Sequence, residues 1–169
     1  MQRLLCTIGF TGKTAEEFFA LLSDAGVQQV IDVRQNRTGQ LSGFSKHPDL
    51  SFFLKKIAGI EYLHEPLLAP PPELLKTYRR TKDWPAYEAG FLAAMRERRV
   101  PAGLDTFSWS PKFSLLCSEP GPEKCHRRLV ADLLAGYWRE QGAAVEIRHL
   151  ISPRQKLTKP RRKSTGVAP

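Results

Sequence analysis

The chain has 169 residues, of which 41% are hydrophobic, and a formal net charge of +9. This length fits one domain with a short extension, and the hydrophobic content is higher than that of disordered chains. The sequence contains no run of about 18 apolar residues, which excludes a membrane-spanning helix. Its first residues lack the apolar segment and cleavage site of a signal peptide, so we expect a cytoplasmic protein.

The three cysteines, Cys6, Cys117 and Cys125, are odd in number and unevenly spaced. A disulfide framework of the kind found in small secreted domains uses an even, regularly spaced set. We therefore expect reduced thiols.

Much of the positive charge lies at the C-terminal end. Residues 153–169 hold six lysines and arginines and no acidic residue, which leaves a net charge of +3 for residues 1–152. Pro153 and Pro160 disfavour a helix there. We expect one domain over residues 1–152 and a disordered basic tail over residues 153–169. The tail either keeps the protein in solution or attracts nucleic acid nonspecifically.

The first 33 residues predict a strand, a helix and a second strand. Residues 4–9 are mostly apolar, as in a buried strand. Thr14 with Glu17 three residues later is a capping box, and it predicts a helix over residues 14–22. Residues 27–33 are rich in β-branched side chains, which predicts the second strand. Strands joined through a helix in this way are parallel.

The alternation of strands and helices continues along the chain. The remaining sequence predicts a helix over 48–58, a strand over 60–64, an irregular proline-rich connection over 66–72, a helix over 83–98, a strand over 113–118, a helix from about 123 to 141 and a strand over 145–151. We expect an α/β fold, a single domain with a mainly parallel sheet flanked by helices (three-layer, Rossmann-like).

The unusual polar residues follow the predicted strands directly. In open parallel sheets, ligands bind beyond the carboxyl ends of the strands. These ends are Gly9–Thr11, Asp32–Arg34, His64–Glu65 and Cys117–Glu119. The positions of these polar residues are therefore consistent with both the predicted parallel sheet and a site at its carboxyl edge.

Cys125, His126 and Arg127 stand at the start of a predicted helix. A helix N-terminus binds anions and lowers the pKa of a nearby thiol, which makes Cys125 a candidate nucleophile with His126 as acid or base. Adjacent side chains on a helix point apart, however, so Cys125 and His126 would not meet there. The alternative is that Cys125 packs inward as a small apolar residue.

Asp32 and Arg34 lie on the same side of their strand. Asp32 is a candidate general base, and the planar fork of Arg34 suits a phosphate or carboxylate. The alternative is a buried ion pair that fixes the strand. Glu119 is either a second acid–base group or a helix cap, and it would pair with Asp32 if their strands are neighbours.

Thr11, Tyr62 and His64, together with Arg34 and Arg127, form the candidate anion-binding set. Tyr62 and His64 share one face of a short strand, although a core tyrosine and an exposed histidine are equally consistent with that spacing. The cysteines and histidines do not have the spacing of a common zinc site. We therefore predict no metal and no cofactor.

Several segments resemble the DUF488 family in order and spacing from about residue 5 to residue 150. They are Thr7–Gly9, Asp32–Arg34, Gly43–Ser45, Gly59–His64, Leu115–Glu119 and Cys125–Arg127. The resemblance implies an α/β fold and implies no activity, because the family is named for its unknown function. It marks Asp32, Arg34, Glu119, Cys125, His126 and Arg127 for testing. The family tends to have a Leu-Gly pair after the Tyr-x-His strand, where this sequence has Leu67-Leu68-Ala69-Pro70, and the bulkier residue at position 68 alters one wall of the site.

Three functions remain open. The first is an enzyme acting on a phosphate-bearing substrate, a nucleotide or nucleic acid, held by Arg34, Arg127 and the helix N-terminus. The second is a non-catalytic nucleic-acid-binding module whose salt dependence rests on the tail. The third is a thiol-dependent sulfur or redox enzyme using Cys125 with Cys117, which requires a lowered thiol pKa. We expect no membrane partner, and the sequence does not predict the oligomeric state.

Overall fold

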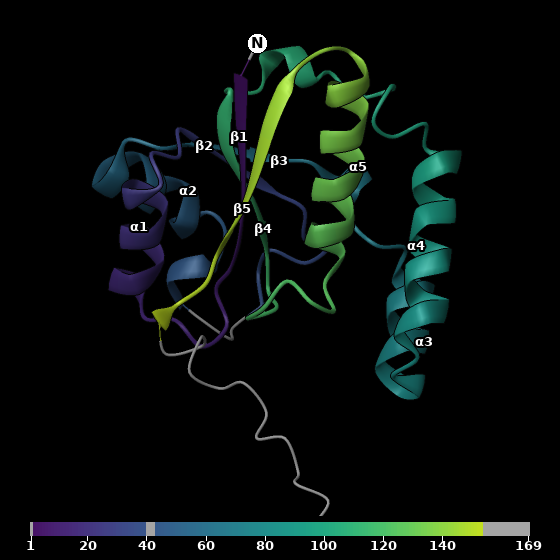
Figure 1. Ribbon diagram of the computed structural model, residues 1–169. Helices are drawn as coiled ribbons and strands as arrows, with labels where there is room; N and C mark the ends of the chain where they lie inside the picture. Colours follow the sequence, from purple (N-terminus) through teal and green to yellow (C-terminus); the bar gives the residue numbers. More distant parts are fainter. Residues whose placement is uncertain (1, 40–42, 154–169) are drawn as a thin grey trace, which may run out of the picture.

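The computed structural model describes residues 2–39 and 43–153, so the predicted basic tail beyond Pro153 lies outside the described residues (Figure 1). One five-stranded, all-parallel sheet forms the centre, with the strand order β3-β2-β4-β1-β5. The strands are β1 (Gln2–Gly9), β2 (Gln29–Asp32), β3 (Glu61–His64), β4 (Lys112–Cys117) and β5 (Ala144–Leu150).

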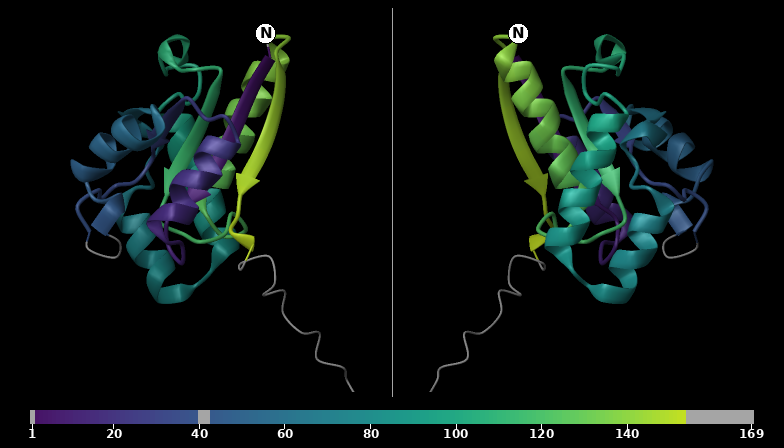
Figure 2. Two further views of the ribbon diagram at one scale, coloured as in Figure 1. Left: turned by 90° about the vertical axis from the view of Figure 1, so that its left-hand side faces the viewer. Right: turned by 90° about the vertical axis from the view of Figure 1, so that its right-hand side faces the viewer.

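Helices cover both faces of the sheet, which confirms the predicted three-layer α/β domain (Figures 1 and 2). On one face lie α1 (Ala15–Asp24) and α2 (Asp49–Phe53), which a π-helical turn, η2 (Leu54–Ala58), continues. On the other face lie α3 (Pro72–Thr81), α4 (Trp84–Glu97) and α5 (His126–Glu140). Short 3₁₀ turns occur at η1 (Gly43–Ser45), η3 (Pro66–Leu68) and η4 (Thr106–Ser108).

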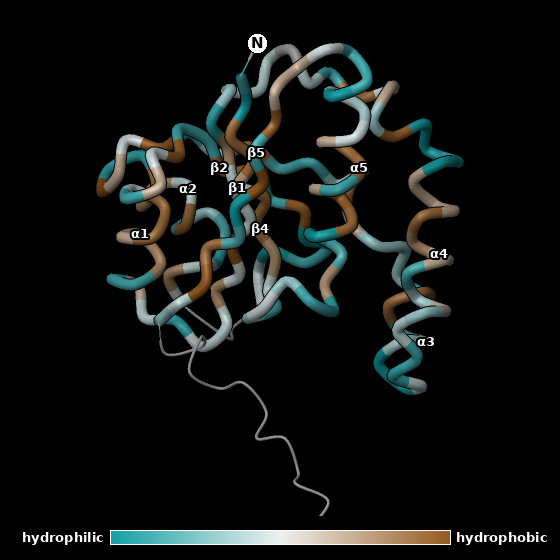
Figure 3. Tube along the Cα trace, viewed as in Figure 1, coloured by the Kyte–Doolittle hydropathy of each residue, from teal (hydrophilic) through white to brown (hydrophobic). Residues whose placement is uncertain are grey.

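Two hydrophobic cores lie on opposite sides of the sheet because successive side chains of a strand point to opposite faces. In β1, Leu5 packs into the core under α4 and α5, whereas Cys6 and Ile8 pack into the core under α1 and α2. The central strands are therefore apolar along most of their length, as the brown tube in Figure 3 shows. Burial on both faces holds the carboxyl ends of these strands in fixed positions.

The capping box of α1 is confirmed, since the Thr14 hydroxyl accepts the Glu17 N–H and the Glu17 carboxylate accepts the Thr14 N–H. The start of α5 differs from the prediction, because this helix begins at His126 and not near residue 123. Pro120 and Pro122 disfavour helical geometry in the residues before them. Cys125 is therefore the N-cap of α5, in extended conformation with φ −138° and ψ 136°.

The sequence did not predict helix α3. Its apolar residues Leu74, Leu75 and Tyr78 recur at helical spacing, but they are only partly buried and follow directly on a proline-rich segment. The helix packs on α4, where the rings of Tyr78 and Trp84 meet edge to face at 5.8 Å. Gly90 of α4 has no side chain and so leaves room for Leu74 of α3. Among the described residues, none of the helices is long and apolar enough to cross a lipid bilayer.

Candidate functional site

The candidate site lies at the carboxyl edge of the sheet, where β2 and β4 end beside the first turn of α5. It consists of two clusters. The thiol cluster contains Cys117, Cys125 and Arg127. The carboxylate cluster contains Asp32, Arg34 and Tyr62.

The two sulfur atoms of the thiol cluster are in contact. Cys117 ends β4 and Cys125 caps α5, and their Sγ atoms are 2.9 Å apart. The three cysteines of the chain are free thiols in this structure. Cys117 is fully buried and Cys125 is 2% exposed, so any reagent that reaches them must be small.

Three donors converge on the sulfur of Cys117. Arg127 Nη1 donates to it at 2.7 Å, and the same nitrogen lies 3.4 Å from Cys125 Sγ. The backbone N–H of Glu119 also donates to Cys117, and the Cys125 thiol, 2.9 Å away, is a third donor when Cys117 is ionised. Donors that surround a sulfur atom beside a guanidinium favour its negatively charged form. Of the two thiols, Cys117 is therefore the one whose ionised form is favoured.

The pKa values of the two thiols separate accordingly. Burial alone would raise the pKa of Cys117, but the hydrogen bond from Cys125 and the charge of Arg127 lower it to about 7. Burial and the adjacent Cys117 sulfur raise the pKa of Cys125 well above its ordinary value. Sequence analysis selected Cys125 as the candidate nucleophile, whereas the lowered pKa belongs to Cys117. The available signal was the position of Cys117, as the last residue of a central strand.

Arg127 is directed into the protein. Its side chain is 1% exposed, and besides the sulfur it donates to the carbonyl oxygen of Glu119 at 2.7 Å. Gly9 makes this approach possible, because a Cβ atom there would overlap the Glu119 carbonyl and lie 3.0 Å from Arg127 Nη1. The nearby Thr11 N–H donates to the Ser118 carbonyl at 3.2 Å, while the Thr11 residue is exposed. The predicted anion-binding guanidinium of Arg127 thus has internal partners.

His126 connects the thiol cluster to the loop after β2. Its Nε2 lies 3.1 Å from the Val33 carbonyl oxygen, so this nitrogen carries the hydrogen and leaves Nδ1 as an acceptor. Nδ1 lies 4.0 Å from Cys125 Sγ. The prediction that these neighbours do not meet assumed a helical Cys125, and the extended Cys125 backbone brings them together. Burial lowers the pKa of His126 to about 4, which makes it neutral near pH 7.

The carboxylate cluster is an internally satisfied ion pair. Asp32 is fully buried and accepts from Arg34 Nε at 2.8 Å and from Arg34 Nη2 at 2.7 Å. The Tyr62 hydroxyl donates to Asp32 at 2.8 Å, and Arg34 also donates to the Ser45 carbonyl at 2.9 Å. Burial and the Asp32 charge raise the pKa of Tyr62 to about 12. This geometry agrees with the alternative in which Asp32 and Arg34 form a buried ion pair that fixes the strand.

The border of the carboxylate cluster is more accessible. His64 Nε2 lies 3.1 Å from the Arg34 carbonyl oxygen, and Arg37 Nη1 donates to the Tyr62 hydroxyl at 3.5 Å. Sequence analysis did not select Arg37, because it lies in a loop with no pattern around it.

Strands β2 and β4 are neighbours, as the predicted pairing of the Asp32 and Glu119 carboxylates requires. Glu119, however, is exposed, whereas both Asp32 oxygens are hydrogen-bonded in the interior.

The described residues contain no cluster of three or more histidine, cysteine or acidic side chains that could hold a metal ion. At the thiol cluster the guanidinium of Arg127 occupies the position beside the sulfurs, where its positive charge would repel a metal cation.

The family model of DUF488, a domain of unknown function, matches residues 14–134. The chain belongs to the DUF488 family. The match is shorter than the resemblance seen from about residue 5 to residue 150, since it leaves out β1 and β5. It includes all members of both clusters, whereas Gly9 lies before it. No curated protein matches this DUF488 chain, and no solved structure does.

Proposed function

We propose that this DUF488 protein is a dithiol redox enzyme. Cys117 is the reactive thiolate, Cys125 is the thiol that completes a reversible disulfide, and a small hydroperoxide is the oxidant. One observation carries this proposal, namely the 2.9 Å contact between the two sulfur atoms beside the Arg127 guanidinium. Among the three functions left open by the sequence, the thiol-dependent one required a lowered thiol pKa, and the pKa of Cys117 is lowered to about 7.

In the first step the Cys117 thiolate attacks the oxygen–oxygen bond of the hydroperoxide. A sulfur–oxygen bond forms and the oxygen–oxygen bond breaks, so that Cys117 becomes a sulfenic acid. The leaving alkoxide, or hydroxide from hydrogen peroxide, takes a proton from water. Arg127 Nη1, 2.7 Å from the sulfur, is placed to hold the thiolate before the attack.

In the second step Cys125 attacks the sulfur of the Cys117 sulfenic acid. The thiol proton of Cys125 is lost in the same step, because buried neutral His126, with its pKa lowered to about 4, is too weak a base to take the proton beforehand. The sulfur–sulfur bond forms, the sulfur–oxygen bond breaks, and hydroxide leaves with that proton as water. A disulfide bond measures about 2.05 Å, so the two sulfurs need to approach by only about 1 Å. Two molecules of a low-molecular-weight thiol then reduce the disulfide and become oxidised to their own disulfide.

The surroundings of Arg127 favour a reversible disulfide over a structural one. Oxidation removes the negative charge of Cys117 and leaves the guanidinium, 1% exposed, without its anion. A buried cation without a partner is costly. The oxidised form is therefore disfavoured and readily reduced.

The phosphate-bearing substrate remains a second hypothesis with weaker support. It needs Arg34 and Arg127 to present their guanidinium groups to a ligand. Arg34 is 5% exposed with its fork on Asp32, and Arg127 is 1% exposed. Binding of nucleic acid by the tail concerns residues outside the described ranges.

Oxidation of the full chain with hydrogen peroxide tests the proposal. We expect a loss of two hydrogen atoms in mass, a disulfide that maps to Cys117 and Cys125, and full recovery with a small thiol. Cys125→Ser should stop the reaction at a sulfenic acid on Cys117, which a dione reagent traps. Cys117→Ser should leave Cys125 unoxidised at the same peroxide concentration.

Cys6→Ser is the matched control, because burial raises the pKa of Cys6 to about 11 and keeps it protonated. This variant should oxidise like the natural chain. Oxidation of Cys125 in the absence of Cys117, or an unchanged mass after peroxide treatment, would contradict the proposal.

A further inference from the structure

A second feature of the protein is a pocket at the amino edge of the sheet, at the end away from the candidate site. It lies where β1 begins and α5 ends, and its volume is about 270 Å³ (Figure 1). Arg3, the second residue of β1, lines the pocket and is only 7% exposed. A charged side chain buried to this extent needs a partner.

The Arg3 guanidinium has no anionic partner among the described residues. Its Nη1 atom is shielded from solvent and makes no hydrogen bond, and no other nitrogen of the group donates to a described residue. The guanidinium lies instead over the ring of Trp138, with Cζ 4.4 Å from the ring centroid. Burial lowers the pKa of Arg3, whereas a neighbouring carboxylate would raise it. The positive charge is therefore balanced only in part, by the face of the ring.

The stacking on Trp138 leaves the arginine suited to a ligand. The ring is 4% exposed and packs edge to face on Phe113 at 5.9 Å, which holds it in place. An arginine that stacks on an aromatic face keeps its N–H donors, which lie in the plane of the guanidinium, for a planar acceptor. A carboxylate is such an acceptor and takes two parallel hydrogen bonds.

The rest of the lining describes the remainder of the ligand. Leu104 and Tyr137 add apolar and aromatic surface, and the buried Thr106 adds a hydroxyl. Gln141 and Gly142 stand at the C-terminal end of α5, where the helix dipole is negative. This end would repel a second negative charge, so the pocket suits a monocarboxylate better than a phosphate dianion.

We propose that this pocket binds a small organic carboxylate, with its single negative charge on Arg3 and a flat apolar group against Leu104 and Tyr137. A protein cavity of about 150 Å³ holds benzene, so a volume of about 270 Å³ accommodates one ring that carries a carboxylate. The ligand supplies the anion that the buried guanidinium lacks. The proposal does not depend on the redox function, because the thiol cluster lies at the opposite edge of the sheet.

Calorimetric titration of the full chain with benzoate tests the proposal. We expect one benzoate site, weaker binding of phenyl phosphate, and much weaker binding of benzyl alcohol, which has the ring without the charge. Arg3→Met removes the charge and should weaken benzoate binding at least about tenfold, because two charge-assisted hydrogen bonds are lost. Arg148→Met is the matched control, since this arginine of β5 is 47% exposed, pairs with Glu146 and should leave binding unchanged.

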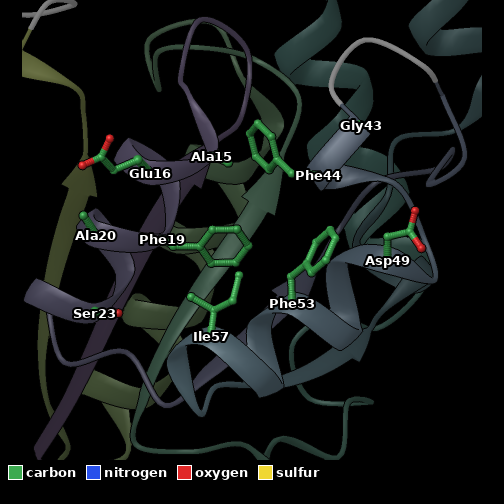
Figure 4. Close-up of a pocket in the computed structure, with 10 residues that line it drawn as sticks. All are labelled: Ala15, Glu16, Phe19, Ala20, Ser23, Gly43, Phe44, Asp49, Phe53 and Ile57. Atoms are coloured by element: carbon green, nitrogen blue, oxygen red, sulfur yellow. The ribbon is translucent and has the colours of Figure 1, made fainter.

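The apolar groove between α1 and α2 is the competing site for an aromatic probe (Figure 4). Its volume is about 740 Å³, and its walls include Phe19 and Phe53. The charged residues that line it, Glu16 and Asp49, are acidic and would repel a carboxylate. Benzoate in this groove would bind no better than benzyl alcohol and would be insensitive to Arg3→Met.

Ala102→Leu provides a second variant, in the pocket itself. Ala102 lines the pocket and is exposed, so a larger side chain there narrows the pocket without disturbing the core. This variant should also weaken benzoate binding at least about tenfold. Absence of benzoate binding, equal binding to Arg3→Met or Ala102→Leu, or tighter binding of phenyl phosphate or benzyl alcohol would overturn the proposal.

Discussion

The two clusters at the carboxyl edge of the sheet both bury a negative charge beside an arginine, yet they leave these charges in different states. Asp32 receives both arms of the Arg34 fork and the Tyr62 hydroxyl, so its oxygens are fully occupied. Cys117 receives Arg127 Nη1, and a second thiol contacts the same sulfur at 2.9 Å. Asp32 is held by partners that do not form a covalent bond with it, whereas the Cys117 sulfur contacts a thiol that can form one.

This difference is the basis on which we separate a structural ion pair from the proposed reactive centre. Planar carboxylate and guanidinium groups match each other in two parallel hydrogen bonds, and such a pair fixes a strand end. A sulfur atom has no such geometric match with a guanidinium, and its neighbour can form a covalent bond with it. We therefore assign fixation of β2 to the carboxylate cluster and chemistry to the thiol cluster.

The largest expected effect concerns the carboxylate cluster. Asp32→Asn removes the charge that balances Arg34, which is only 5% exposed, and should destabilise the fold by about 3–5 kcal/mol. Urea unfolding measures this loss. Glu61→Gln is the matched control, because the Lys55–Glu61 pair is 67% and 62% exposed and should contribute about 0–1 kcal/mol. Equal effects of the two variants would show that Asp32 does not hold the strand end.

His126 lies between the clusters and gives a pH test. Its pKa is lowered to about 4, so folding favours the neutral imidazole. A lowered pKa stabilises the fold above the ordinary histidine value of about 6.5, and this contribution is lost as the pH falls toward 4. Between pH 7 and pH 4.5 the natural chain should lose about 2 kcal/mol more stability than His126→Asn. Parallel losses in urea unfolding at the two pH values would contradict the buried neutral state.

Arg127→Met tests the thiol cluster. Without the guanidinium, the pKa of Cys117 should rise to at least the ordinary cysteine value of about 8.5, so that the thiolate fraction at pH 7 falls by at least about fifteenfold. The ultraviolet absorbance of the thiolate follows this change. Arg127→Lys keeps the charge and should show a smaller change. A Cys117 pKa that stays the same in Arg127→Met would remove the electrostatic basis of the redox proposal.

The smallest effect should follow from Tyr62→Phe. Asp32 then keeps its two bonds to Arg34 and loses one hydrogen bond, which should cost about 0.5–1.5 kcal/mol in urea unfolding. The pKa of Cys117 should not change, because Tyr62 belongs to the other cluster. A shift of that pKa would show that the two clusters act as one unit.

Sequence patterns were sufficient to predict the layers of this fold. The capping box of α1 and the apolar runs of the strands are local signals, and the structure confirms them. Helix α3 was missed because its short apolar stripe, Leu74, Leu75 and Tyr78, follows directly on a proline-rich segment and packs on α4 without full burial. The helical spacing of these three residues was a local signal that the sequence contained.

The location of the site was predictable, but its chemistry was not. Residues after the strands of a parallel sheet meet at one edge, which brings Asp32, Cys117 and His126 into the same region. The choice between Cys117 and Cys125 depends on where the Arg127 side chain points. That direction results from the extended Cys125 backbone and from the space beside Gly9, neither of which has a local sequence signal.

The most direct test of the central claim is a thiolate titration by ultraviolet absorbance in the Cys6→Ser background. With Cys125→Ser added, only Cys117 remains, and we predict a transition near pH 7, because serine keeps a donor beside the sulfur. With Cys117→Ser added, only Cys125 remains, and it should stay protonated to well above the ordinary pKa of cysteine. If Cys125 loses its proton at the lower pH, or if neither thiol titrates below the ordinary value, then Cys117 is not the reactive thiolate.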